Sequence, residues 1–172
     1  MDTRQTEQTE ISPAARDAFN QDDALAPFYA AGAGVLRTTY EAELVRLARQ
    51  YTAFAGTTRN ALNLIAGLRN GGGITLYGAA GDVSFSPPTA PMGWSRVQRI
   101  LNLARAGLTS LGIDHPQPAQ IEAALMGGSL PTEHGMVGFP GVLRMHSARV
   151  DWTRIAHAFA LATPESAAQQ SS

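Results

Sequence analysis

The chain has 172 residues, a formal net charge of −1 and an apolar fraction of 44%. A chain of this length suits one domain with its own hydrophobic core. The near-neutral charge counts against a dedicated nucleic-acid binder, which usually carries a basic excess. The absence of cysteine excludes disulfides and thiolate chemistry, and the absence of lysine excludes a Schiff-base lysine.

Both ends of the chain are polar. Residues 1–24 are rich in Gln, Thr and Asp with little apolar periodicity, which predicts a disordered or loosely attached N-terminal tail. Residues 164–172 predict a disordered C-terminal tail, which leaves residues 25–163 as a single helical domain. Because the sequence has neither an apolar signal core nor a run of about 18 apolar residues, we expect no membrane association. Cytoplasm is the default location, and a mature exported form is the alternative.

Two helices are predicted first along the chain. Thr38, with Glu41 three places on, matches a capping box for a helix over 39–54. A second helix starts at Thr57 or Thr58 and ends at Asn70, where three glycines follow. The first helix has one apolar face at helical spacing, formed by Tyr40, Leu44, Leu47, Tyr51 and Phe54.

A short hairpin is predicted next. Residues 74–78 and 82–88 alternate apolar and polar side chains around a glycine-bearing turn. Pro87 and Pro88 end the second strand, since proline donates no ladder hydrogen bond. A two-stranded hairpin is marginal by itself, so we expect it to pack on the helices.

The central and C-terminal parts predict four further segments. A long amphipathic helix runs from Gly93 to Leu111 and ends with a left-handed cap at Gly112. Pro118 is well placed at the first position of a helix over 118–126. The two segments after it are a loop over 129–138 and a helix over 139–146.

Asp151 caps the last predicted helix, which covers residues 152–161. Taken together, the segments predict a mainly α protein, a compact orthogonal bundle of five or six short helices with one small β-hairpin.

Several stretches resemble a family of uncharacterised bacterial proteins of the proteobacterial type, small and helical. They are FAGTTRNALNLIAGLRNGGGITL, FSPPTAPMGWSRVQRILNLARAGLTSLGI, PQPAQIEAALMGG and WTRIAHAF, over residues 54–76, 85–113, 116–128 and 152–159. The resemblance covers about residues 50–160, and its motifs are mostly structural. It implies no activity and transfers no functional residue. Many members resemble exported proteins, which agrees with a mature exported form as the alternative location.

No motif predicts a metal, a cofactor or a catalytic residue. The histidines lack the helical i,i+4 spacing of metal ligands, and the glycines at 71–73 follow a helix, whereas phosphate loops follow a strand. Glu133, His134 and His115 are the candidates for an unrecognised acid/histidine site in a hydrolase. We favour the interpretation that these residues have surface or structural roles over the interpretation that they form a catalytic site.

Two interaction hypotheses remain. Trp94 with Arg96 and Arg99 predicts a protein-binding patch, because Trp and Arg dominate interface hot spots, although Trp94 as a core anchor is the plainer interpretation. Phe28 and Tyr29 are a second candidate docking segment.

The alternative partner is a nucleic acid. The segment LRMHSARVDWTRIAHAFAL is similar to the opening half of a helix-turn-helix, but no second helix with basic side chains follows it. Arg144, Arg149 and Arg154 are its candidate phosphate contacts. The sequence therefore favours a non-enzymatic protein-interaction or assembly module, self-associating or binding another protein. A nucleic-acid-associated protein and a hydrolase are the alternatives.

Overall fold

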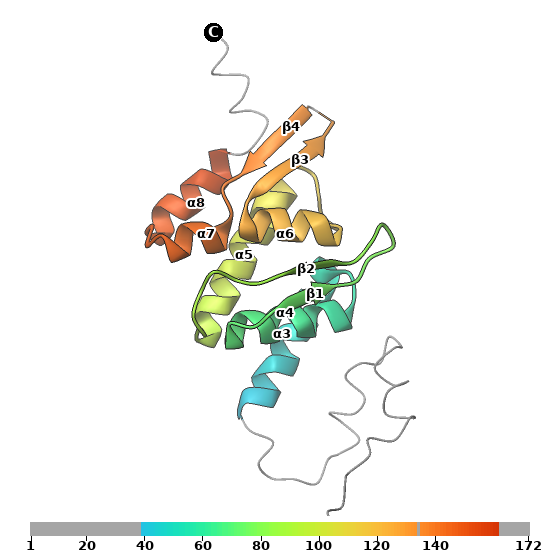
Figure 1. The fold of residues 1–172 in the computed structure, drawn as a ribbon, viewed down its shortest axis with the longest axis vertical. Coiled ribbons are helices and arrows are strands. Elements are labelled where there is room, and N and C mark those ends of the chain that lie inside the picture. The colour runs from blue at the N-terminus through green and yellow to red at the C-terminus, as the bar shows by residue number, and fades with distance from the viewer. Residues whose placement is uncertain (1–38, 134, 162–172) are drawn as a thin grey trace, which may run out of the picture.

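The computed structural model describes residues 39–133 and 135–161. Within them lie six helices and two antiparallel strand pairs (Figure 1). The elements in chain order are α3 (Thr39–Ala55), α4 (Thr58–Asn70), β1 (Ile74–Leu76), β2 (Val83–Phe85), α5 (Trp94–Ser110), α6 (Pro118–Met126), β3 (Gly128–Thr132), β4 (Gly135–Phe139), α7 (Val142–Ser147) and α8 (Trp152–Leu161).

The long helix α5 connects the two ends of the molecule. At one end α3 and α4 pack on each other and β1–β2 lies across α4, while α6, α7, α8 and β3–β4 gather at the other end (Figure 1). One continuous cluster of buried apolar side chains runs from α3 to α8 and includes Leu47, Leu101 and Ile155. The mainly helical class is therefore confirmed, and the orthogonal arrangement of the helices stays a prediction.

The predicted helix ends are confirmed where the local chemistry specifies them. The side chain of Thr57 accepts a hydrogen bond from the backbone of Asn60 at the start of α4, and Gly71 ends that helix at φ 68°. Gly112 follows α5 at φ 77°, which places it in the left-handed region that glycine favours. Pro118 occupies the first turn of α6, where the side-chain oxygen of Gln120 accepts a hydrogen bond from the backbone nitrogen of Gln117 at 2.8 Å. Thr38 lies outside the described residues, as do the tails predicted at 1–24 and 164–172.

The first hairpin is confirmed with shorter strands. Ile74 pairs with Phe85 and Leu76 with Val83 in an antiparallel register. Asn60 fastens this hairpin to α4: its amide donates to the backbone oxygens of Ala55 (3.1 Å) and Tyr77 (2.8 Å), and its oxygen accepts from the backbone nitrogen of Tyr77 (2.9 Å). Asn60 is only 1% exposed. All these partners are backbone groups that a buried site must satisfy.

In the second half of the chain one prediction is wrong, and one helix is confirmed with a later start. Residues 129–138 were expected to form a loop and the chain to hold one hairpin, but β3 and β4 pair to form a second hairpin. The strands GSLPT and GMVGF contain three glycines and a proline, residue types that are depleted in strands, so they give little β signal. The helix expected over 139–146 begins at Val142, because Phe139 belongs to β4 and Gly141 turns the chain at φ 79°.

No helix in the ranges 39–133 and 135–161 has both the length and the apolar character needed to cross a bilayer.

Candidate interaction surface

Trp94 lies at the start of α5 and is half-buried against the α3–α4 end of the molecule. Its ring centroid is 5.1 Å from that of Tyr40, and the guanidinium carbon of Arg69 lies 5.1 Å from the ring centre. Arg69 also donates to the backbone oxygen of Met92 at 3.0 Å. Trp94 therefore packs among residues of its own chain, as the core-anchor interpretation expects.

Arg96 and Arg99 are exposed on α5 and have different neighbours from Trp94. Arg99 stacks over the ring of Trp152 from α8, with its guanidinium carbon 5.2 Å from the ring centre. His146 from α7 stacks on the same tryptophan, 4.7 Å between centroids and 19° between planes. Burial of the His146 ring, and after it the positive charge of Arg96, lower the pKa of His146 below its ordinary value.

The structure thus groups Arg96 and Arg99 with His146 and Trp152, a set that we call the Trp152 cluster. Trp94 and Arg96 are two positions apart on one helix, and residues at this spacing do not face each other. The proposed interaction role of Trp94, Arg96 and Arg99 stays a prediction. Phe28 and Tyr29 lie outside the described residues.

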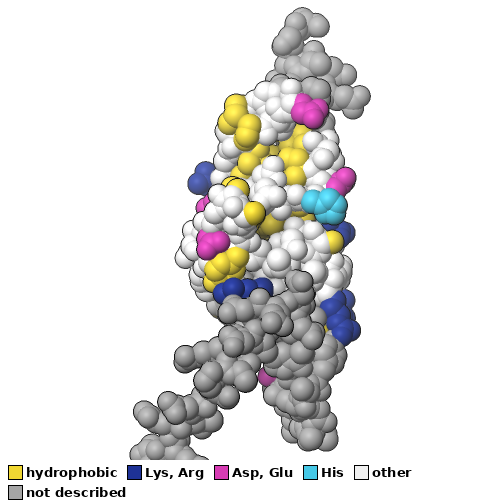
Figure 2. Space-filling view, turned by 90° about the vertical axis from the view of Figure 1, so that its right-hand side faces the viewer, with side chains coloured by type: hydrophobic (Ala, Val, Ile, Leu, Met, Phe, Trp, Pro, Cys, Tyr) yellow, Lys and Arg dark blue, Asp and Glu magenta, His cyan; other side chains and the backbone are white. Residues whose placement is uncertain are grey.

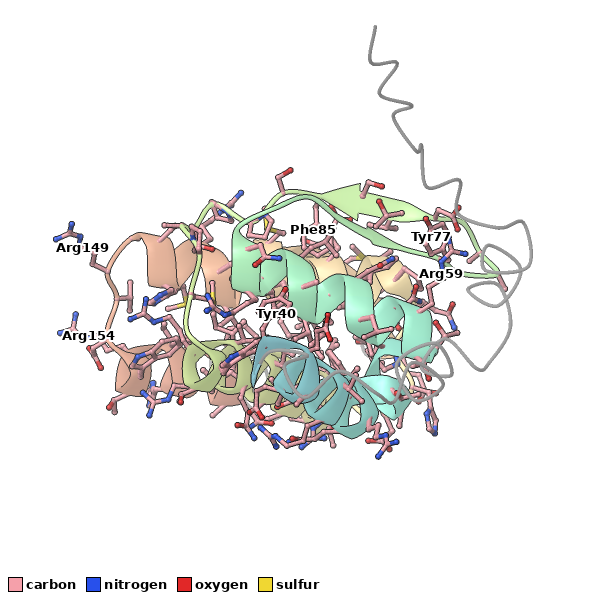
Figure 3. All side chains as sticks on the ribbon, turned by 90° about the horizontal axis from the view of Figure 1, so that it is seen from below. Tyr40, Arg59, Tyr77, Phe85, Arg149 and Arg154 are labelled. Atoms are coloured by element: carbon pink, nitrogen blue, oxygen red, sulfur yellow. The ribbon has the colours of Figure 1, made fainter. Side chains whose placement is uncertain are left out.

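Arg144, Arg149 and Arg154 are all exposed on the helix pair α7–α8. Arg149 and Arg154 point away from the body at one end of the molecule (Figure 3). Arg154 forms an exposed ion pair with Asp151 at 3.5 Å.

Arg149 occupies the left-handed turn between the two helices at φ 60°, and is the one non-glycine residue with positive φ among the described residues. The backbone nitrogens of Arg149 and Val150 bond back to the oxygens of His146 and Met145 at 3.0 Å, which closes a Schellman motif. α7 and α8 are therefore two helices joined by a short turn, and α8 is the second helix of this pair. The similarity of this segment to a DNA-binding helix-turn-helix stays a prediction.

The β3–β4 hairpin is the part of the surface that sequence reasoning missed. Its pairs run from Gly128↔Phe139 to Thr132↔Gly135, with a two-residue turn between the strands. Leu130 and Phe139 are buried and Val137 is half-buried, so one face of the hairpin packs on the body. The alternation of these three apolar residues is the feature of the sequence that could have predicted the hairpin. The hairpin extends beyond the helices at the top of Figure 1.

The two-residue turn determines which backbone groups of the hairpin point outward. Its closing pair, Thr132↔Gly135, is a hydrogen-bonded pair, so Pro131↔Met136 is a non-hydrogen-bonded pair and the pattern alternates along the strands. Pro131 agrees with this assignment, because proline has no N–H to exchange. The outer edge of β4 therefore presents the N–H and C=O groups of Met136 and Gly138.

This outer edge of β4 is open in the described part of the chain. The sheet consists of β3 and β4 alone, and none of the described loop or turn hydrogen bonds reaches Met136 or Gly138. The edge of β3 is different, since Pro131 removes a donor there. An unpaired row of donors and acceptors is a template for another strand.

The solvent face of the two strands is uncharged and carries an exposed apolar side chain. Met136 is 68% exposed and is the one large hydrophobic side chain that stands exposed among the described residues. Neither strand contains a charged residue. Seen from the side of the hairpin tip, hydrophobic side chains gather in the upper half of the molecule, with charged side chains at the margins (Figure 2).

Two hollows of the described surface contain the candidate residues of the hydrolase hypothesis. A groove of about 540 Å³ between α5, α6 and β3 is lined by Leu111, Ile113 and Pro131, and its one carboxylate is Glu133. A second hollow, of about 370 Å³, contains His115. The described lining residues thus do not bring an acid and a histidine into one hollow. His134 lies outside the described residues, and among those described no three His, Asp or Glu side chains are grouped to hold a metal ion.

Comparison of the chain with known protein families, with curated proteins and with solved structures finds no match. The resemblance to an uncharacterised bacterial family therefore stays a prediction.

Proposed function

We propose that this protein is a non-enzymatic interaction or assembly module whose docking element is the β3–β4 hairpin. The single observation that carries the proposal is the outer edge of β4, where backbone groups that no described strand pairs with lie beside the exposed side chain of Met136. Strand addition at such an edge supplies affinity through main-chain hydrogen bonds, and neighbouring side chains supply specificity.

The contrast with other exposed strands supports this proposal. Proteins commonly protect an edge strand with lysine, proline or an inward-pointing charge. In this hairpin only the β3 edge has such protection, through Pro131, while β4 reads GMVGF and has none. An unprotected edge on a projecting hairpin is a liability unless a partner covers it.

Site-specific photocrosslinking of the full chain in cells tests the proposal. A photoreactive amino acid at Met136 is expected to give covalent adducts with a protein partner, whereas the same residue at Ala106, exposed on α5, gives none. Gly138→Pro removes one outward donor without touching the inner ladder, and is expected to abolish the adducts. Equal adducts at the two positions, or none at Met136, would refute docking through the hairpin.

Nucleic-acid binding is the second candidate, supported by three exposed arginines on the α7–α8 pair: Arg144, Arg149 and Arg154. Only Arg154 has an ion pair within the described residues. Binding would neutralise phosphates and weaken steeply with salt. A mobility shift with mixed-sequence DNA and RNA at low salt tests this candidate, and the three arginines replaced by glutamine provide the control. The absence of a shift at micromolar protein ends it.

A further inference from the structure

We infer that the partner of the β3–β4 hairpin is the same hairpin of a second copy of this chain. The two β4 strands pair antiparallel about a two-fold axis and form a four-stranded sheet. This inference rests on the proposed docking function and names its partner.

The backbone pattern of β4 is self-complementary. Its outward N–H and C=O groups belong to Met136 and Gly138, which lie symmetrically on either side of Val137. A two-fold axis through Val137 therefore places Met136 opposite Gly138 of the second copy, and Gly138 opposite Met136. Each of these two pairs exchanges two hydrogen bonds, which gives four bonds across the interface. Contacts that repeat in this way are the signature of a two-fold interface.

The side chains fit the same register. Met136 and Gly138 lie on the solvent face of β4, opposite to the buried Phe139. A β-carbon at Gly138 would have no atom within 4 Å, so the space above this residue is open. In the two-fold pair, the exposed Met136 of one copy covers the open space above Gly138 of the other. The pairing would thereby remove the most exposed large apolar side chain of the described residues from water.

The charges of the strand do not oppose pairing with a second copy. Around a two-fold axis each charged side chain near the centre meets its own copy, and like charges across strands are destabilising. The strand GMVGF contains no charge, so this penalty is absent. The β3 edge lacks the equivalent symmetry, because Pro131 cannot donate. With only two five-residue strands in contact, we expect weak, concentration-dependent association.

A charge exchange at Met136 tests this geometry on the full chain. In the inferred pair the two Met136 side chains are diagonal neighbours on one face, within reach of long side chains. Met136→Lys alone and Met136→Glu alone are each expected to weaken self-association by about tenfold or more in sedimentation equilibrium. An equimolar mixture of the two variants is expected to associate at least as tightly as the wild type.

Recovery in the mixture separates a lost interface from a misfolded variant. Ala106→Lys is the matched control, because it adds the same charge at an exposed position of α5, outside the hairpin, and is expected to associate like the wild type. A wild-type chain that stays monomeric up to about 1 mM overturns the inference. Failure of the mixture to recover also overturns it. If Met136 still crosslinks to a different protein in cells, the hairpin docks another partner. The proposed docking function then stands, and only the inferred pairing with a second copy is wrong.

Discussion

Gly107 lies in the last turn of α5, beside Phe159 of α8, and replacing it tests the described packing of these two helices. A β-carbon at this position would lie 2.4 Å from Cδ1 of Phe159 and 3.4 Å from Cε1 of Phe139. The two phenylalanine rings pack on each other with centroids 5.7 Å apart. The added methyl group therefore overlaps the edge of the Phe159 ring. This ring has little room to move because it packs against Phe139.

Two opposing effects determine the result for Gly107→Ala. Alanine is a better helix former than glycine by about 1 kcal/mol. Overpacking a buried site costs about 1–3 kcal/mol, and the short contact with Phe159 favours the upper part of that range. We therefore expect a net loss of about 1–2 kcal/mol in the free energy of unfolding, with a fall in Tm of about 2–8 °C for a chain of this size.

Urea denaturation and thermal unfolding measure this loss, and two companion variants identify its cause. In a Phe159→Leu background the ring is gone, so Gly107→Ala should become neutral or stabilising through helix propensity. Gly72→Ala is the control for a glycine replacement without a clash, since nothing lies within 4 Å of its added carbon and its φ is outside the left-handed region. A Gly107→Ala protein as stable as the wild type would refute the close approach of α5 and α8.

Three further predictions concern stability. The pKa of His146 is lowered in the folded protein, so the unfolded state binds more protons, and stability should fall as pH drops below about 6.5; His146→Gln should flatten this part of the pH profile, and an unchanged slope would contradict the assignment. Asn60→Leu leaves the N–H and C=O of Tyr77 without their partner and should cost about 2–4 kcal/mol by urea denaturation, whereas a loss below about 0.5 kcal/mol would mean that water replaces the amide. Arg149→Gly relieves a left-handed residue and should stabilise the protein by about 0.5–1 kcal/mol, and a net loss of stability would show that the arginine side chain is needed in the turn.

The helices were predictable because their boundaries are set by residues next to them in sequence. Gly71, Gly112 and Pro118 each act within one turn of their own helix, and each does so in the structure. The apolar stripes between these boundaries then specify which faces become buried.

The β3–β4 hairpin was not predictable in the same way because its stability comes from packing against the body. Its strands are short and rich in glycine, and its inward face has three large apolar side chains, Leu130, Val137 and Phe139. A pattern of three alternating apolar residues does not distinguish a strand from a loop without the surface on which they pack. The main candidate surface, the β3–β4 hairpin, is therefore formed by a stretch of sequence with little regular pattern.

The neighbours of the arginines depend equally on tertiary contacts. Trp94, Arg96 and Arg99 are close along the chain, yet Arg99 lies on Trp152, more than fifty positions away. Helical periodicity already places Trp94 and Arg96 on different sides of α5. Only the arrangement of α7 and α8 shows which aromatic ring meets which arginine.

Amide hydrogen exchange of the full chain, followed by NMR over a range of protein concentrations, tests the pairing of β4 most directly. The amides of Met136 and Gly138 should gain protection as concentration rises, since their N–H groups become bonded only when a second copy binds. The amide of Val137 bonds to Leu130 within the hairpin, so its protection should change much less and serves as the internal reference. Met136 and Gly138 amides that exchange without protection at every concentration would contradict assembly through this edge.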